Sequence, residues 1–130
     1  MTDLSSQIDS LADAWLRYQT VALTRDERAL DGHPDFDAVM ATSALARNQP
    51  AAAISFIQGV LCRTEDEELL AILAAGPLED LLVYHGPEVI ERIENLSRND
   101  DKFRQLLFGV WRNEIDSSTW NRLEAIRTEH

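Results

Sequence analysis

The chain of 130 residues carries 45% hydrophobic residues and a formal net charge of −11, which suits one compact domain over residues 1–130. Its single cysteine, Cys62, excludes an internal disulfide framework and a multi-cysteine zinc site. The excess of acidic residues argues against binding to nucleic acid or to an anionic membrane, because both surfaces are negatively charged.

Helical spacing begins at the start of the chain. Apolar residues three or four positions apart predict an amphipathic helix over residues 4–18. The capping-box spacing of Thr24 and Glu27 predicts a second, short helix before a break at residues 31–34. Asp35 is the expected N-cap of a third helix, which we expect to end near residue 48. The first third of the chain is therefore predicted to be helical.

The middle of the chain continues this pattern. Pro50 suits the first turn of a helix over residues 50–61, and residues 64–67 form a second capping-box pattern. Gly76-Pro77 and Gly86-Pro87 are each expected to end one helix and to start the next. On this interpretation a helix of only about two turns lies between the two Gly-Pro pairs.

Two further predicted helices follow the segment after Pro87. The apolar residues from Phe103 to Trp111 have the most regular helical spacing in the chain. Residues 116–118 are the expected cap of a last helix that ends near Ile126. The predicted fold is all-α, with seven or eight short antiparallel-packed helices that form either a helical bundle or a HEAT-like stack of helical hairpins.

A short pattern in the middle of the chain resembles a known family. The residues AGPLEDLL at positions 75–82, followed by His85-Gly86, are similar to a family of small bacterial proteins of unknown function. The resemblance covers residues 48–125 and implies a bacterial cytoplasmic origin, but no activity. Residues 1–35 lie outside it and are expected to form an N-terminal helical extension packed on the family-like part.

The first candidate site is a group of titratable side chains at the second Gly-Pro pair, namely Glu79, Asp80, His85 and Glu88. Such residues can carry acid–base or metal chemistry. The favoured interpretation is structural, because acids in a first helical turn and a histidine near a helix end stabilise the helix dipole. The alternative is a small enzyme or ligand-binding protein that uses Glu79, Asp80 and His85.

The second candidate is the segment 64–91, which has eight acidic residues and no basic one. A negative face of this kind would attract a basic protein partner, whereas the bland interpretation is a solvated surface. The candidate partner-binding residues from both groups are Glu65, Asp66, Glu68, Glu79, Asp80, His85, Glu88 and Glu91.

The remaining conspicuous side chains are interpreted as structural. Trp15, Trp111 and Trp120 fall on apolar helical stripes, so we expect them in the core. Cys62 is expected to be a small buried hydrophobe, and His33 an exposed loop residue.

The function that this sequence favours is a non-enzymatic protein–protein interaction or regulatory module, for example one that neutralises a basic toxin. We expect another protein as its partner, with a basic protein as the natural class of target, and neither nucleic acid nor membrane. A homo-oligomer that shares the stripe from Phe103 to Trp111 stays open. The sequence has no motif for a cofactor or a metal, so we expect a protein without a cofactor. It has neither a secretory signal nor an apolar stretch long enough to span a bilayer, so we expect it in the cytoplasm.

Overall fold

The computed structural model describes residues 4–128, with side chains from residue 6 onward, and this part contains helices and loops but no strand. The predicted all-α class is therefore confirmed. The α-helices are α1 (Leu4–Ala22), α2 (Glu27–Leu30), α3 (Phe36–Asn48), α4 (Pro50–Leu61), α5 (Glu67–Leu73), α6 (Glu79–Asn99), α7 (Asp101–Leu106) and α8 (Ser117–Thr128). A π-helical segment, η1 (Ala74–Leu78), joins α5 to α6, and a 3₁₀ segment, η2 (Leu107–Gly109), follows α7.

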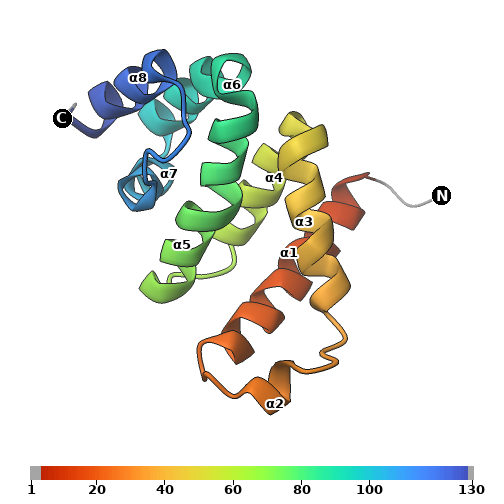
Figure 1. Cartoon of the computed structure of the whole chain (residues 1–130). Helices are drawn as coiled ribbons and strands as arrows, with labels where there is room; N and C mark the ends of the chain where they lie inside the picture. The colour runs from red at the N-terminus through yellow and green to blue at the C-terminus, as the bar shows by residue number, and fades with distance from the viewer. Residues whose placement is uncertain (1–3, 129–130) are drawn as a thin grey trace.

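The helices pack in two connected groups. Helix α1 contacts α3 and α4, and α6 contacts α3, α7 and α8. Figure 1 shows α2 at one end of the molecule and α8 at the other, with the α5–α6 helix running between them. Helices α3 and α6 thus connect the N-terminal and C-terminal helices.

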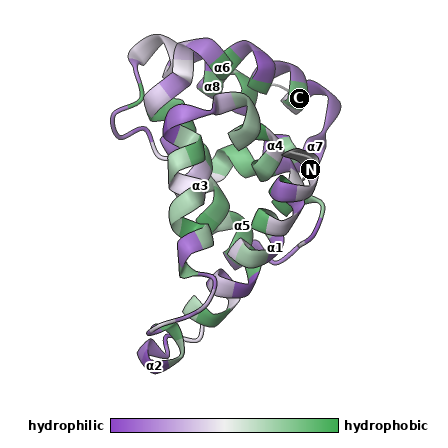
Figure 2. Cartoon of the chain, turned by 90° about the vertical axis from the view of Figure 1, so that its right-hand side faces the viewer, coloured by the Kyte–Doolittle hydropathy of each residue, from purple (hydrophilic) through white to green (hydrophobic). Residues whose placement is uncertain are grey.

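The core lies where these helices meet. Figure 2 shows hydrophobic residues concentrated along α3, α4 and α5 in the middle of the molecule. The Trp15 and Phe56 rings pack edge to face there, with centroids 6.0 Å apart. The largest fully buried side chains are Trp15, Phe56, Phe103, Ile54, Ile57, Leu73, Leu78, Leu81, Leu82, Ile90, Ile93 and Leu107.

The chain does not break at either Gly-Pro pair, so the predicted helix ends at these positions are wrong. Pro77 lies inside η1, and the helix continues from Glu67 to Asn99. Proline donates no backbone hydrogen bond in any helix, but the wider turn of a π-helix gives its ring room beside the carbonyl of residue i−4. At Pro87 the helix bends instead, because His85 leaves the helical region with φ −137°. One kinked helix therefore replaces three predicted helices.

This long helix also revises the expectation that the chain has no apolar stretch long enough to span a bilayer. By length and composition, the 33 residues from Glu67 to Asn99 are long and apolar enough to cross a membrane. Within this fold one face of the helix lies in the core, where Leu81, Leu82 and Ile93 are fully buried. A core helix passes the same test as a membrane span.

The predicted helix from Phe103 to Trp111 is shorter than expected. Helix α7 ends at Leu106, and Val110 already has extended backbone after η2. Phe103, Leu106, Leu107 and Val110 are buried in the chain's own core. Four residues of the stripe are therefore buried within one chain, whereas Trp111 at its end is exposed.

The helix caps differ in detail from the expected ones. Asp26 and Asp66, not the preceding threonines, accept the hydrogen bonds that start α2 and α5. Asp35 makes no capping bond with its side chain. Asp116 does cap α8, since its carboxylate accepts a hydrogen bond from the Thr119 N–H at 3.2 Å.

Candidate functional site

The carboxylate of Glu79 holds a loop. Its Oε1 accepts a hydrogen bond from the Trp111 N–H at 3.0 Å, and its Oε2 accepts one from the Asn113 side-chain amide at 2.5 Å. Asn113 itself has a left-handed backbone with φ 42°. The predicted role of Glu79 as a helix-start acid is wrong, because no helix begins at Pro77. Glu79 instead fastens the loop before α8 to the long helix.

Asp80 is the partly buried member of this pair. Burial raises the pKa of the Asp80 carboxyl, the neighbouring Glu79 carboxylate raises it further, and Arg47 acts in the opposite direction. The neutral form of Asp80 is thus favoured relative to an exposed aspartate. No helix start explains its position either.

His85 sits at the kink and joins two helices. Its Nε2 lies 2.5 Å from the carbonyl oxygen of Arg47, in the last turn of α3, and its Nδ1 lies 3.1 Å from Oε1 of Glu88. The hydrogen bond to the Arg47 carbonyl raises the pKa of His85, and the Glu88 carboxylate adds to this effect. From the sequence, we expect His85 at the end of its own helix. In the structure, His85 instead contacts a carbonyl group in the last turn of another helix, α3.

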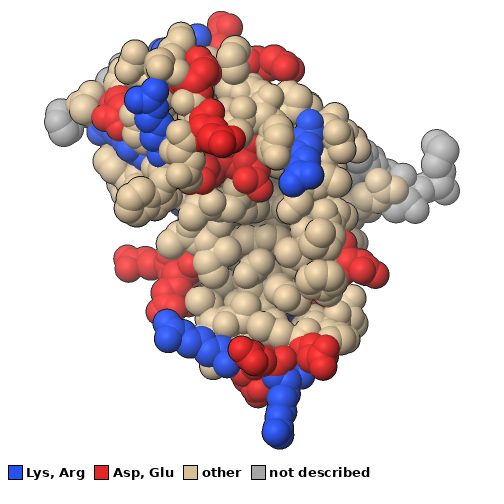
Figure 3. Space-filling model, viewed as in Figure 1, with Lys and Arg blue, Asp and Glu red and all other residues tan. Residues whose placement is uncertain are grey.

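The eight acids of segment 64–91 do not form one free surface. Asp66 caps α5 by accepting hydrogen bonds from the N–H groups of Glu68 and Leu69 at 2.9 and 3.1 Å. Glu79 and Asp80 are half-buried. Figure 3 shows the acidic side chains of the chain in separate groups, several of them beside basic side chains, with an uncharged area in the middle of the face. The exposed acids that bond no backbone group are Glu65, Glu67, Glu68, Glu88 and Glu91.

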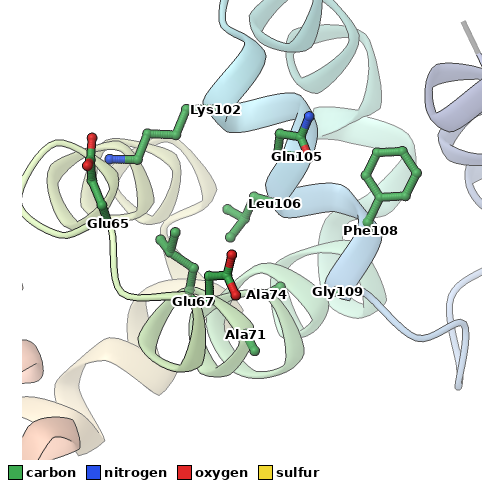
Figure 4. Close-up of a pocket in the computed structure, with 10 residues that line it drawn as sticks. Glu65, Glu67, Ala71, Ala74, Lys102, Gln105, Leu106, Phe108 and Gly109 are labelled. Carbon is green, nitrogen blue, oxygen red and sulfur yellow. The ribbon is translucent and has the colours of Figure 1, made fainter.

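A groove with a volume of about 710 Å³ lies between α5 and α7. Its apolar lining comes from Leu70, Ala71, Ala74 and Leu106, and from Phe108 in η2. Figure 4 shows Phe108 at one end of the groove and the charged side chains of Glu65 and Lys102 at the other. We call this feature the α5–α7 groove.

The charged side chains at the groove differ in whether they already have hydrogen-bond partners in the chain. The ammonium group of Lys102 donates hydrogen bonds to the carbonyl oxygens of Leu61 and Thr64, the latter at 2.8 Å. It therefore satisfies groups at the end of α4. Glu65 and Glu67 line the groove and have no hydrogen bond or ion pair within residues 4–128. The unpaired charge at the groove is thus negative.

The base of the groove depends on close packing between η1 and η2. A Cβ atom added at Gly109 would lie 2.7 Å from the Cβ of Ala74. Real Cβ atoms essentially never approach so closely, so Gly109 allows the two segments to touch. The glycine had no assigned role in the sequence-based interpretation.

The aromatic residues are divided between the core and the surface. Trp15 is buried as predicted, and Trp120 is half-buried with the Arg127 guanidinium 4.8 Å from its ring centroid. The prediction for Trp111 is wrong, because 71% of this residue is exposed. Phe108 is 55% exposed and was missed as a surface residue. Phe108 falls outside the i, i+3, i+4, i+7, i+8 spacing that starts at Phe103, and this offset was the available signal that its side chain lies off the buried face.

Two further predictions need correction. Cys62 is exposed, and its thiol donates a hydrogen bond to the Gly59 carbonyl oxygen at 3.1 Å. His33 is half-buried, with its ring packed edge to face on Tyr18 at a centroid distance of 5.3 Å. Within residues 4–128 there is no group of three His, Cys, Asp or Glu side chains placed to hold a metal ion.

Comparison with known proteins gives a family and no activity. No curated protein and no solved structure matches the chain. The sequence profile of a family of unknown function (DUF6869) matches residues 26–130, which extends the resemblance seen in the sequence further toward both ends. The chain belongs to this family of unknown function.

Proposed function

We propose that this protein is a non-enzymatic interaction module that binds a protein partner in the α5–α7 groove. The partner segment carries apolar residues with lysine or arginine beside them. The observation that carries this proposal is the combination of an apolar groove, an exposed Phe108 and two unpaired acids, Glu65 and Glu67, in one place.

The apolar lining supports the first half of the proposed recognition. Exposed aromatic side chains next to a concave apolar surface are typical of the residues that dominate binding energy in protein interfaces. Phe108 presents its ring at one end of the groove. An apolar side chain of the partner would remove Phe108, Leu70 and Ala71 from water together.

The charge supports the second half. Segment 64–91 has no basic residue, and the one lysine at the groove already bonds two carbonyl groups of the chain. The two carboxylates of Glu65 and Glu67 outnumber the single Lys102 ammonium, so a basic partner segment meets a net negative charge at the groove. The same charge would repel acidic segments and nucleic acid, which gives the groove selectivity.

Selection from a random 12-residue peptide library on the wild-type protein tests this proposal. We expect enriched peptides to combine lysine or arginine with apolar residues. Their binding should weaken by about tenfold or more in Phe108→Ser, since loss of one central aromatic anchor commonly has this effect. Binding in Glu65→Lys/Glu67→Lys should weaken similarly, and higher salt should weaken wild-type binding.

The matched control is Glu88→Lys/Glu91→Lys, which reverses two exposed acids of the same segment outside the groove. We expect this variant to keep nearly all of its affinity. Equal losses in both charge-reversal variants would show that only net charge matters. Enriched peptides without basic residues, or peptides that bind Phe108→Ser normally, would overturn the proposed groove.

A further inference from the structure

A second hollow, with a volume of about 630 Å³, lies between α1 and the loop that joins α2 to α3. It is far from the α5–α7 groove in sequence and shares no lining residue with it. Three aromatic rings line it, from Tyr18 in α1, His33 in the loop and Phe36 at the start of α3.

The three rings are set at large angles to one another. The Tyr18 ring lies at 82° to the His33 ring with centroids 5.3 Å apart, and at 51° to the Phe36 ring with centroids 6.1 Å apart. Phe36 is 48% exposed, so its ring is not packed in the hydrophobic core. The Tyr18 ring contacts the other two, and all three border the same hollow, so an organic cation in it would lie against aromatic surface.

The charge around the hollow is negative. Asp31 and Asp37 line it, and neither carboxylate has a hydrogen bond or ion pair within the described residues 4–128. Asp35 is already neutralised, since its two oxygens bond the Arg17 guanidinium at 3.0 and 3.1 Å. No lysine or arginine of residues 4–128 lines the hollow. Two unpaired anions therefore flank the aromatic walls.

The walls are held in place before any ligand arrives. Nδ1 of His33 accepts a hydrogen bond from the Asp35 N–H at 3.0 Å, which holds the ring in place. Gly32 allows the loop to turn there with φ +66°. The Arg17–Asp35 pair links α1 to the residue before α3. A preformed site loses less conformational entropy on binding.

We propose that this hollow, lined by Tyr18, His33, Phe36, Asp31 and Asp37, binds an organic cation with an alkylammonium head. Aromatic faces attract weakly hydrated cations through the ring quadrupole, and the carboxylates add charge attraction. Strongly hydrated inorganic cations gain little from such walls. This site is independent of the proposed protein partner.

Titration with choline, followed by amide NMR shifts, tests the site directly. We expect saturable shifts of the amide signals of residues 18, 31–33 and 35–37. The uncharged carbon isostere 3,3-dimethyl-1-butanol should bind about tenfold more weakly or worse, because it keeps the shape and loses the charge. Potassium at the same concentration should leave these signals in place. Equal shifts with choline and its isostere would overturn the proposal, as would no shift with choline.

Variants separate the ring effect from general damage. Phe36→Leu keeps an apolar side chain and removes the π face, and Asp37→Asn removes one charge. Each should weaken choline binding by about threefold or more. Tyr84→Leu is the matched control, since Tyr84 is another half-exposed aromatic outside the hollow. Unchanged choline affinity in Phe36→Leu and Asp37→Asn, with a native NMR spectrum, would contradict the proposed cation site.

Discussion

The carboxylate of Glu79 accepts a hydrogen bond from the backbone N–H of Trp111, and this bond holds the most exposed of the large hydrophobic side chains that the structure describes. The two residues lie 32 positions apart in the sequence. A second bond from Asn113 to Glu79 fixes the same loop. An acid that the sequence marked as a candidate binding residue therefore acts by positioning a segment of the chain.

Replacing Glu79 should loosen this loop without unfolding the protein. In Glu79→Ala, the N–H of Trp111 loses its acceptor, so its hydrogen exchange should become faster by about tenfold, and stability should fall by about 1 kcal/mol. Amide exchange measured by NMR checks the loop, and urea denaturation checks the stability. Asp80→Asn is the control, because Asp80 bonds neither Trp111 nor Asn113. Equal exchange at Trp111 in Glu79→Ala and the wild type would contradict this role.

A side chain at Gly86 should disrupt the contact between α6 and α8. The added Cβ would lie 2.8 Å from Oγ1 and 2.9 Å from Cγ2 of Thr119, which is buried. We expect Gly86→Ala to lower the free energy of unfolding by about 1–3 kcal/mol, as other overpacked sites do. The control is Gly76→Ala in η1, where nothing lies within 4 Å of the added atom.

Urea denaturation of both glycine variants gives the comparison. Gly76→Ala should be neutral or slightly stabilising, since alanine restricts the unfolded chain more than glycine does. Adding Thr119→Ala to Gly86→Ala should recover part of the loss, because it removes the two closest atoms. Similar stability of Gly86→Ala and the wild type would show that α8 is not seated on the kink as described.

The link from His85 to α3 should depend on pH. Its folded pKa lies above its ordinary value, because the protonated ring donates to both the Arg47 carbonyl and Glu88. The stabilisation is therefore fully present below the unfolded pKa of about 6.5 and is lost as pH rises through the folded pKa. We expect a contribution of about 1 kcal/mol at low pH.

The difference in unfolding free energy between the wild type and His85→Gln isolates this effect from the titration of other groups. The difference should be largest below the ordinary histidine pKa of about 6.5 and should shrink as pH rises through the higher folded pKa. An NMR titration should give a lower His85 pKa in Glu88→Gln than in the wild type. A wild-type His85 pKa at or below that of a free histidine would contradict the link.

Arg127 should be hard to replace even by lysine. Its guanidinium donates to the carbonyl oxygens of Leu107 and Val110 and lies over the Trp120 ring. A lysine loses the planar fork that reaches both carbonyls, so Arg127→Lys should cost about 1–3 kcal/mol. Arg122→Lys is the control at the exposed pair with Glu94 and should cost less than about 1 kcal/mol. Thermal unfolding of the two variants decides between these outcomes.

Hydrophobic spacing was enough to predict α1, α4 and α8, because their buried faces follow the helical period. Helix α3 was also predicted, but the apolar side chains of Phe36 and Met40 on it are exposed, and its buried residues are Thr42 and Ala46. It was not enough at Pro77, where a π-helical turn accommodates the proline, or at Pro87, where the helix bends at His85. The period also continues past the true end of α7. The contact between Gly109 and Ala74, distant in sequence, accompanies that end, so the exposure of Trp111 could not be predicted.

The candidate sites likewise combine features that the local sequence shows with features that only the folded chain creates. The acidic segment was visible in the sequence, but the bonds that occupy Asp66 and Glu79 depend on the folded chain. The α5–α7 groove joins Glu65 to Phe108, and the second hollow joins Tyr18 to Phe36 across a loop. Local spacing carries no information about such pairs. Only the packing of the helices brings them together.

The central claim is that the α5–α7 groove binds a basic and apolar segment of a protein partner. Site-specific photo-cross-linking in the protein's native cells, with Phe108→p-benzoylphenylalanine, tests it most directly. The same replacement at Tyr84, which is exposed but outside the groove, is the control. We predict an adduct from position 108, absent from position 84, whose cross-linked peptide contains lysine or arginine next to apolar residues. Adducts from position 84 alone, or none from position 108, would contradict the claim.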